Sequence, residues 1–419
     1  MISKLAAAAA ALSLWPGASA AYPSIPVLKD VIGGTANACK LAAGPNGGKL
    51  AGFDLADNVK SMGSIKGWMM FIDFPDAEGN VTDPQAIFDS HAPAAEAWYH
   101  TSSYEKLSLQ ISGDTKQIYR MPATTASYQW EGGISSFHLM NYVQDALDAY
   151  MKAHGGDASA FPEMDILYLV APPSATFSNS YAYMYEPETR LPEGAGNETV
   201  GTAVAHRAVA FGHDFHSEFN ARGYKVLVHE TGHTFGLPDY YLTNGTGSLG
   251  DLVGGFSLMG ATFEQAPDMF GWDKWRMGWL ADSAVQCITE KGSTTHVLSP
   301  LEKPAESGSK QVVVVATSGT TMLVAEARTK NGVDNELCGP GVLLYTVDTN
   351  VASGQGPIRV LNGIDLDLRW CGGYVANLAP LSFTSPRKSS LTLEEFGVTV
   401  TLTEHNEATD HWTIKVDYK

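Results

Sequence analysis

The chain has 419 residues, of which 44% are hydrophobic and 17% are charged, and this composition is ordinary for a globular protein of one large or two medium domains. Its formal net charge of −18 argues against nucleic acid and anionic membranes as partners, because proteins bind both through basic surfaces. Beyond these exclusions, the function has to be inferred from particular residues.

Residues 1–20 have the three parts of a secretory signal peptide. Lys4 supplies the positive start, residues 5–15 form an apolar stretch, and Ala18-Ser19-Ala20 offers the small residues that a signal peptidase needs. The apolar stretch is too short to span a bilayer. We therefore expect a secreted protein without a membrane anchor, whose mature chain begins near Ala21.

An even number of cysteines fits the oxidising compartment that secretion implies: Cys39, Cys287, Cys338 and Cys371. Four cysteines allow three pairings. In one of them Cys338 pairs with Cys371 within the C-terminal part, and Cys39 pairs with Cys287.

The sequence also contains three sequons for N-glycosylation, at Asn80, Asn197 and Asn244. They would be glycosylated surface loops in a host that glycosylates, although such triplets also arise by chance.

Along the chain, residues 21–62 are rich in Gly, Ala and Pro, and they predict either an arm that lies on the domain or a short pro-segment. The apolar run at 67–74 predicts a buried strand, and alternation at 107–111 predicts a half-exposed one. Apolar residues at helical spacing predict a helix over 136–154, capped by Ser135 or Ser136.

Further strands are expected at 165–170 and 202–211, and this order favours an α+β domain with a mixed sheet backed by helices. Past residue 280 the pattern changes to short β-branched runs separated by turn residues, which is typical of an all-β sandwich. These runs lie at 312–315, 322–327, 342–347, 398–402 and 412–416. We place the boundary near residue 283, between a domain at 63–283 and a β-rich domain at 284–419.

The segment from residue 229 to residue 239 reads HETGHTFGLPD and has the residue types of a metal-dependent hydrolase. In a helix, His229 and His233 lie on one face one turn apart, so both imidazoles can bind the same zinc ion. Glu230 then projects toward the open side of the ion, where it can act as a general base toward water.

A catalytic zinc ion usually takes three protein ligands, so a third is required. Gly236 suits the left-handed position that ends a helix, and Pro238 cannot continue one. The chain must therefore turn, and Asp239 then returns toward the metal. The predicted zinc ligands are His229, His233 and Asp239.

This motif matches the metzincin pattern H-E-x-x-H-x-x-G-x-x-D and resembles that of the immune inhibitor A-type metallopeptidases, which carry aspartate in place of the more usual third histidine. Segments 71–76 and 103–107 resemble that family's first strand and its following segment. Segment 275–280 is similar to the helix that closes its catalytic domain, and 341–348 to a downstream strand. The similarity runs from about residue 64 to about residue 350, densely near the motif.

The resemblance implies a secreted zinc endopeptidase with a metzincin-like catalytic domain. It also implies that Ser257-Leu258-Met259-Gly260 is the Met-turn, which places Met259 beneath the zinc ligands as a hydrophobic base. Members of the family often have long N-terminal pro-regions, whereas here the region is short. Cys39 could cap the zinc and hold the enzyme latent, although a disulfide is its plainer fate in a secreted chain. Asp54 is a second candidate for this capping role.

Two alternatives stay open. In a gluzincin arrangement, Glu264 would replace Asp239 as the third ligand. In the other alternative, the protein is a non-catalytic secreted binding protein that acts through its β-rich half. Inactive relatives would be expected to lack Glu230 or a histidine of the motif, and all of these residues are present.

A second histidine cluster is best interpreted as a solvated loop, because no third ligand follows at useful spacing: His206, His213 and His216. Calcium is a further candidate cofactor, since it favours oxygen ligands. Four acidic residues could bind it, but they match no ordered calcium-binding loop and are expected on the surface: Asp251, Glu264, Asp268 and Asp273.

We expect a monomer that acts on protein or peptide substrates. Residues 177–201 are expected to be among the loops that form its substrate cleft.

Overall fold

The computed structural model describes residues 35–44, 51–54, 60–131, 133–184, 206–216, 223–262, 268–364 and 378–419. Among these residues, no helix is both long enough and apolar enough to cross a membrane. The predicted signal segment and the sequon at Asn197 lie outside the described residues, so these two predictions stay untested.

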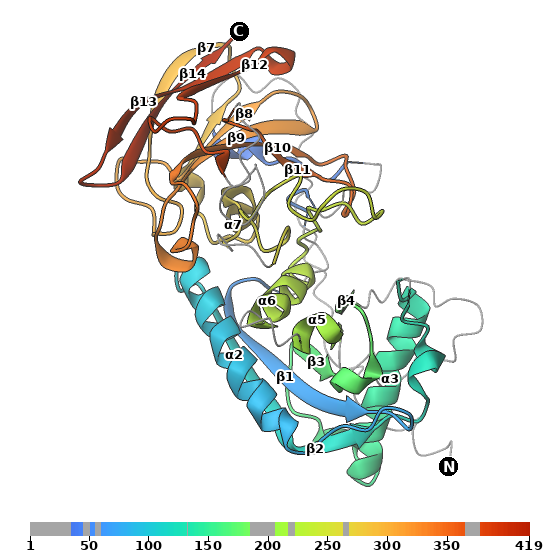
Figure 1. Ribbon diagram of the computed structural model, residues 1–419. Helices are drawn as coiled ribbons and strands as arrows, with labels where there is room; N and C mark the ends of the chain where they lie inside the picture. The colour runs from blue at the N-terminus through green and yellow to red at the C-terminus, as the bar shows by residue number, and fades with distance from the viewer. Residues whose placement is uncertain are drawn as a thin grey trace, which may run out of the picture. The chain divides into compact units, whose positions relative to one another are not determined.

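A mixed sheet of five strands forms the N-terminal part, in the order β2-β1-β3-β5-β4 (Figure 1). Neighbouring strands are parallel except at one edge, where β4 pairs antiparallel with β5. Four of these strands coincide with predicted ones, and β4 was not predicted. The strands are β1 (Gly63–Asp73), β2 (Leu107–Arg120), β3 (Ile166–Val170), β4 (Tyr181–Met184) and β5 (Arg207–Phe211).

Helices cover both faces of this sheet, as Figure 1 shows. Helices α2 (Asp83–Ser102) and α6 (Gly223–Thr234) share one hydrophobic core with Met69 of β1. Helix α3 (Ser136–Ala153) packs with Met70 and the other side chains that point to the opposite face. A strand covered on both faces is continuously apolar, which explains the unbroken run in β1, while the edge strand β2 alternates.

The two long helices differ in how far the sequence predicts them. Helix α3 begins at the predicted residue and ends one residue before the predicted end, and the Ser135 hydroxyl caps it by accepting a hydrogen bond from the His138 N–H at 3.3 Å. Helix α2 was not predicted, because it contains Pro93, and an interior proline removes a backbone hydrogen bond. Packing compensates for that loss, since Trp98 and Tyr99 of α2 are buried in the core.

Two sheets form the C-terminal part, in the orders β11-β10-β9-β8-β6 and β12-β13-β14-β7. Val313 and Leu344 of the first sheet share a core with Val400 and Ile414 of the second, so the sheets form the expected sandwich. All five predicted runs lie in strands. The strands are β6 (Val285–Ile288), β7 (Gly292–Leu298), β8 (Val312–Ala316), β9 (Thr321–Arg328), β10 (Gly341–Asp348), β11 (Ile358–Val360), β12 (Ser390–Leu393), β13 (Val398–Asn406) and β14 (His411–Tyr418).

The chain is thus a mixed α and β protein with three sheets and few helices, consistent with the expected α+β class. Its largest core continues from the first sheet into the sandwich, and it includes Met69, Trp272 and Val324. Trp272 belongs to α7 (Gly271–Arg276), which overlaps only the start of the segment expected to be helical at 275–280. The boundary near residue 283 stays a prediction.

The described part of the N-terminal arm is packed as an integral part of the protein. Phe53 contacts the rings of Trp272 and Trp275 edge-on, with centroids 5.1 and 4.7 Å away. Lys40 forms an ion pair with Asp282 at 2.8 Å. These contacts hold the described residues of the segment on the protein, and the choice between an arm and a pro-segment stays a prediction.

A disulfide ties the same arm to the sandwich. Cys39 is bonded to Cys287 of β6, with 5.8 Å between their Cα atoms, and this confirms one of the pairings that the sequence allows. Cys338 is also disulfide-bonded, while Cys371 lies outside the described residues.

The expected surface position of the acidic residues is wrong for Asp268 and Asp273, which are both fully buried. Asp268 pairs with Lys274 at 2.7 Å, and Asp273 pairs with Arg276 at 3.4 Å. A buried carboxylate needs such a partner, because desolvation strongly disfavours an unpaired charge. Asp251 is exposed as expected, and Glu264 lies outside the described residues.

Arg328 of β9 neutralises a larger group of buried carboxylates. Its guanidinium lies 3.3 Å from Glu302 and 3.2 Å from Glu326, and its Nε donates a hydrogen bond to Asp334 at 2.8 Å. All four side chains are inaccessible to solvent. This group lies between the sandwich and α7, since the Glu326 carboxylate also accepts the Gly271 N–H at 2.7 Å.

We expect Arg328→Met to lower the free energy of unfolding by about 3–5 kcal/mol, because it leaves buried carboxylates without their cation. Urea denaturation followed by circular dichroism measures the change. The matched control is Arg359→Met, which alters an exposed side chain and should change stability by less than about 0.5 kcal/mol. Equal effects of the two substitutions would contradict the role given to Arg328.

Candidate metal centre

The end of helix α6 turns the chain back on itself as the sequence predicts. Gly236 has a φ of 82°, the left-handed conformation that glycine adopts most easily. The Gly236 N–H donates to the His233 carbonyl at 2.9 Å, and the Leu237 N–H donates to the Gly232 carbonyl at 3.2 Å. This pair of bonds is a Schellman motif, and Pro238 follows it directly.

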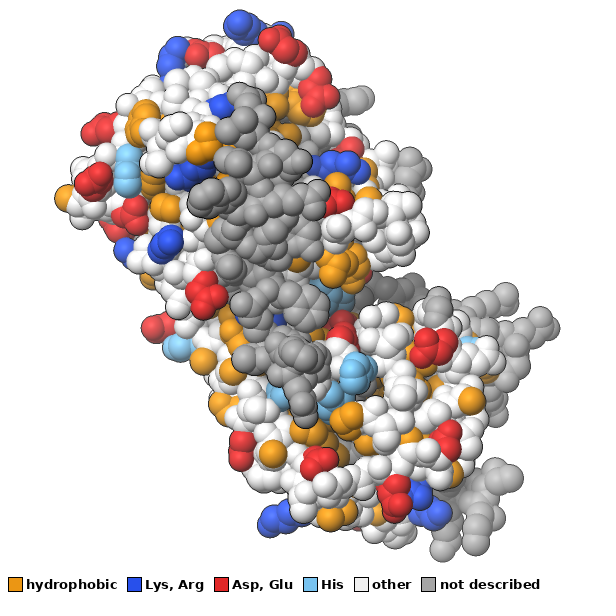
Figure 2. All heavy atoms as spheres, in the orientation of Figure 1, with side chains coloured by type: hydrophobic (Ala, Val, Ile, Leu, Met, Phe, Trp, Pro, Cys, Tyr) orange, Lys and Arg blue, Asp and Glu red, His pale blue; other side chains and the backbone are white. Residues whose placement is uncertain are grey.

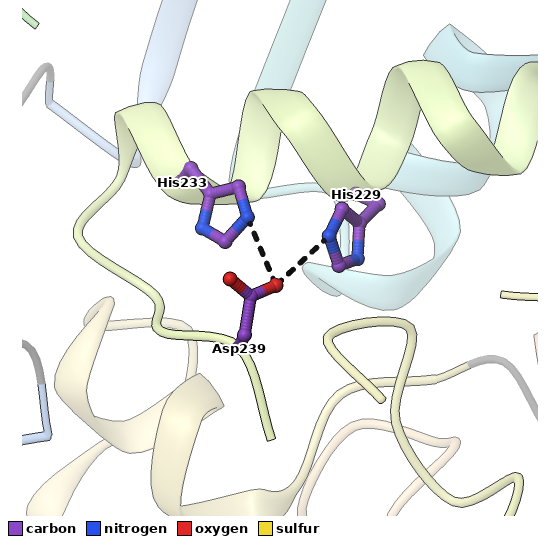
Figure 3. A group of neighbouring side chains, drawn as sticks. All are labelled: His229, His233 and Asp239. Carbon is purple, nitrogen blue, oxygen red and sulfur yellow. Dashed lines mark ion pairs between the residues drawn. The ribbon is translucent and has the colours of Figure 1, made fainter. Parts of the chain in front are cut away.

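The turn brings Asp239 under the two histidines of α6, as Figure 3 shows. Asp239 Oδ1 lies 3.3 Å from His229 Nε2 and 3.3 Å from His233 Nε2. Within the described part of the chain, this is the one group of three or more His, Cys, Asp and Glu side chains arranged so that they could hold a metal ion.

Backbone carbonyls orient both imidazole rings. His229 Nδ1 lies 2.6 Å from the Leu258 carbonyl, and His233 Nδ1 lies 2.7 Å from the Leu237 carbonyl. A carbonyl only accepts hydrogen bonds, so each Nδ1 must carry a proton. In the neutral ring the lone pair is then on Nε2, which faces Asp239, and this is the tautomer that a metal-binding histidine needs.

The carboxylate of Asp239 has one oxygen that the protein leaves unsatisfied. Oδ1 is buried and receives no hydrogen bond of ordinary geometry, although a buried polar atom normally has a partner. Burial opposes the charge of this group, but the two histidines outweigh it and hold the pKa of Asp239 well below its usual range. Burial likewise opposes a charged His233, yet Asp239 raises the pKa of His233 to about 9.

Both pKa shifts favour a negative Asp239 carboxylate beside a protonated His233 ring. A divalent cation competes with that proton, and it would satisfy the buried oxygen and both ring nitrogens at once. The donor set of two imidazoles and one carboxylate suits a first-row divalent metal.

Met259 packs against the helix that carries the histidines, and its role in a Met-turn stays a prediction. Its side chain is fully buried, and a β-carbon placed on Gly232 would lie 2.7 Å from the Met259 sulfur. The Met259 carbonyl accepts the Tyr240 N–H at 2.8 Å. Met259 thus connects α6 to the segment that follows Asp239.

The group of three opens into a cleft of about 840 Å³. Glu230 lines this cleft beside the histidines, although its side chain is almost completely buried. Burial raises the pKa of Glu230 to about 7, against the opposing charges of His229 and His233. Part of the lining comes from residues 178–182, within the segment expected to form cleft loops.

Figure 2 shows acidic and basic side chains spread over the described surface of one face, with no continuous basic patch there.

Polar residues that line the cleft and were not predicted include Asp214, Tyr241 and Ser353. The Tyr241 ring lies nearly parallel to that of His229, with 6.3 Å between centroids, and its position two residues after the motif was a usable signal. Asp214 and Ser353 had no such signal, because they lie far from the motif in sequence and only the fold brings them to it.

Other expectations about the site are corrected. His213 and His216 lie on the short helix α5 (His213–His216) and not in a loop, and His216 Nε2 contacts the Ala171 carbonyl at 2.7 Å. Cys39 is in a disulfide, which is the fate that the sequence favoured for it. The Asp54 carboxylate accepts the Ala43 N–H at 2.8 Å, and neither Cys39 nor Asp54 lines the cleft. Glu264 lies outside the described residues.

Arg276 of α7 connects the turn at the end of α6 to the N-terminal arm. Its Nε donates to the Gly52 carbonyl at 2.6 Å, and its Nη2 donates to the Gly236 carbonyl at 3.1 Å. The guanidinium is fully buried. A single side chain therefore satisfies backbone carbonyls from both segments.

Comparison with models of known protein families gives no match, and a search of curated proteins finds none with detectable similarity.

We expect Met259→Ala to destabilise the protein by about 2–5 kcal/mol, because the truncation leaves a cavity under the helix that carries the histidines. Met259→Leu conserves volume and should cost less than about 1.5 kcal/mol. Thermal unfolding of both variants measures the difference. If alanine and leucine are equally well tolerated, Met259 is not a packing support for α6.

Proposed function

We propose that the protein is a secreted zinc-dependent endopeptidase of the metzincin type, with His229, His233 and Asp239 as the zinc ligands and Glu230 as the general base. The observation that carries this proposal is the convergence of two ring nitrogens and one carboxylate oxygen beside a cleft that Glu230 also lines. Secretion is inferred from the signal-like residues 1–20 and agrees with the disulfide.

The spacing of the ligand atoms supports zinc. A tetrahedral ion with bonds of about 2.0–2.1 Å separates neighbouring ligand atoms by about 3.3 Å. Asp239 Oδ1 lies 3.3 Å from each histidine Nε2, so these two spacings match those around the ion, and all three ligand atoms lie within 4.8 Å of one another. Three protein ligands with a cleft on the open side are typical of a catalytic zinc site, whereas a structural site is closed by a fourth.

When bound, zinc would supply Lewis-acid chemistry by polarising the scissile carbonyl and increasing the acidity of a water beside it. Glu230 accepts the proton of that water and passes it to the amine that leaves. The position of Glu230, next to His229 on α6 and open to the cleft, suits this transfer. The products are two peptides, and the glutamate returns to its starting protonation state.

The lining of the cleft favours an extended polypeptide as substrate. Tyr181 and Ala182 of β4 line the cleft, and β4 is the edge strand of its sheet. An edge strand presents backbone N–H and C=O groups that an extended peptide can pair with. Protein or peptide substrates therefore fit this cleft better than compact small molecules.

The first test replaces the proposed base. Glu230→Gln keeps the size of the side chain but removes its ability to accept a proton, so casein digestion should fall by about 10²–10⁴-fold while zinc stays bound. Digestion by the unaltered protein should stop with a chelator and return with zinc. Metal content by atomic absorption and digestion by release of soluble peptides are measured on the same samples.

Glu163→Gln is the matched control, because the side chain of Glu163 is 85% exposed and does not line the cleft. It should leave digestion unchanged. If the unaltered protein binds zinc but digests nothing, the alternative of a non-catalytic binding protein is favoured. Full activity of Glu230→Gln would exclude Glu230 as the base.

The second test concerns the third ligand. Asp239→Asn should weaken zinc binding by more than about 100-fold, since it removes the charged oxygen that faces both rings. Glu264→Gln should bind zinc as the unaltered protein does. Competition with a chromophoric chelator gives both affinities. The opposite result, with loss of zinc in Glu264→Gln alone, would establish the gluzincin arrangement.

A further inference from the structure

The third proposed ligand is held by a loop of the C-terminal sandwich. Ser353 follows β10 and precedes β11, so it belongs to the sheet of the sandwich and not to the helix-backed sheet. Its Oγ accepts the Asp239 N–H at 2.9 Å. The same hydroxyl donates to Asp239 Oδ2 at 3.4 Å, a longer contact.

The backbone of the same loop contacts both sides of Asp239. The Gly354 N–H donates to the Asp239 carbonyl at 3.0 Å, and the Gly354 carbonyl accepts the Thr243 N–H at 3.0 Å. Gly354 has a φ of 72°, and a β-carbon at this position would lie 2.2 Å from Thr243 Oγ1. Only glycine fits here, because both the conformation and the close approach exclude a side chain.

These contacts matter because Asp239 lies beyond the end of α6. The helical hydrogen bonds stop at the turn before Pro238, so nothing within α6 determines where the carboxylate points. Ser353 binds Oδ2 and Gly354 binds the main-chain carbonyl, which leaves Oδ1 as the oxygen that faces the rings of the histidines. Groups that orient a metal ligand in this way contribute to metal affinity without touching the metal.

We propose that Ser353, supported by Gly354, is a positioning residue for Asp239, so that a loop of the C-terminal sandwich completes the metal centre that α6 begins. This inference deepens the proposed function and rests on the zinc site assigned there. It gives the β-rich part a specific role at the centre, which is to fix the rotation of one carboxylate.

The test measures the affinity of the full-length protein for zinc alone, by competition with a chromophoric chelator. Ser353→Ala should weaken zinc binding by about 10–100-fold, as is typical for loss of a group that orients a metal ligand. Ser390→Ala is the matched control, because Ser390 is also half-buried in the sandwich and its hydroxyl bonds only to Val400 and Thr401 of β13 among the described contacts. This control should bind zinc as the unaltered protein does.

A purely structural role for Ser353 would change stability but not affinity, so the thermal unfolding of the chelator-treated variants is measured beside the titration. Ser353→Thr and Ser353→Val form a second pair, nearly equal in volume, of which only threonine keeps the hydroxyl. Threonine should bind zinc more tightly than valine. The comparison holds even if the alanine variant folds poorly.

Unaltered zinc affinity in Ser353→Ala, or equal affinities of the threonine and valine variants, overturns the positioning role. That outcome leaves the proposed peptidase intact, because Asp239→Asn still reports on the ligand itself. If the unaltered protein binds no zinc in the same assay, the metal centre and the positioning role fall together.

Discussion

The reversal of the chain after helix α6 is the constraint on which the candidate site depends. A helix can place two imidazoles on one face, but it cannot supply a third ligand from the same direction, so the chain has to stop and return. Gly236 makes that return possible with two backbone hydrogen bonds and a left-handed φ. The loop that carries Ser353 then determines where Asp239 points. The candidate group of ligands is therefore assembled from one helix, one turn and one distant loop.

Much of this arrangement could be predicted from local sequence. The spacing of the two histidines, the glycine of the turn and the proline after it act within a few residues, so their consequences can be inferred without the fold. The same holds for α3, whose apolar periodicity and Ser135 cap agree, and for the β-branched runs of the sandwich. Where the local sequence pattern agrees with the tertiary packing, the expected helices and strands coincide with the observed ones.

The residues that could not be predicted depend on contacts between distant parts of the chain. Helix α2 forms despite Pro93, because the burial of its aromatic side chains compensates for a poor local signal. Asp268 and Asp273 look like surface charges until their cations are found inside the protein. Ser353 is unremarkable in sequence, and only the packing of the sandwich against the turn brings it to Asp239.

Arg276 has a consequence for how distant parts of the protein influence each other. Its guanidinium binds the carbonyl of Gly52 in the arm and that of Gly236 in the turn, so ordering either segment favours the arrangement in which the other is held. Such coupling is reciprocal by thermodynamic necessity. A cation that orders the turn would also strengthen the attachment of the arm. Conversely, the arm is fixed to β6 by the Cys39–Cys287 disulfide, and this would reduce the conformational entropy that the turn loses when the cation binds.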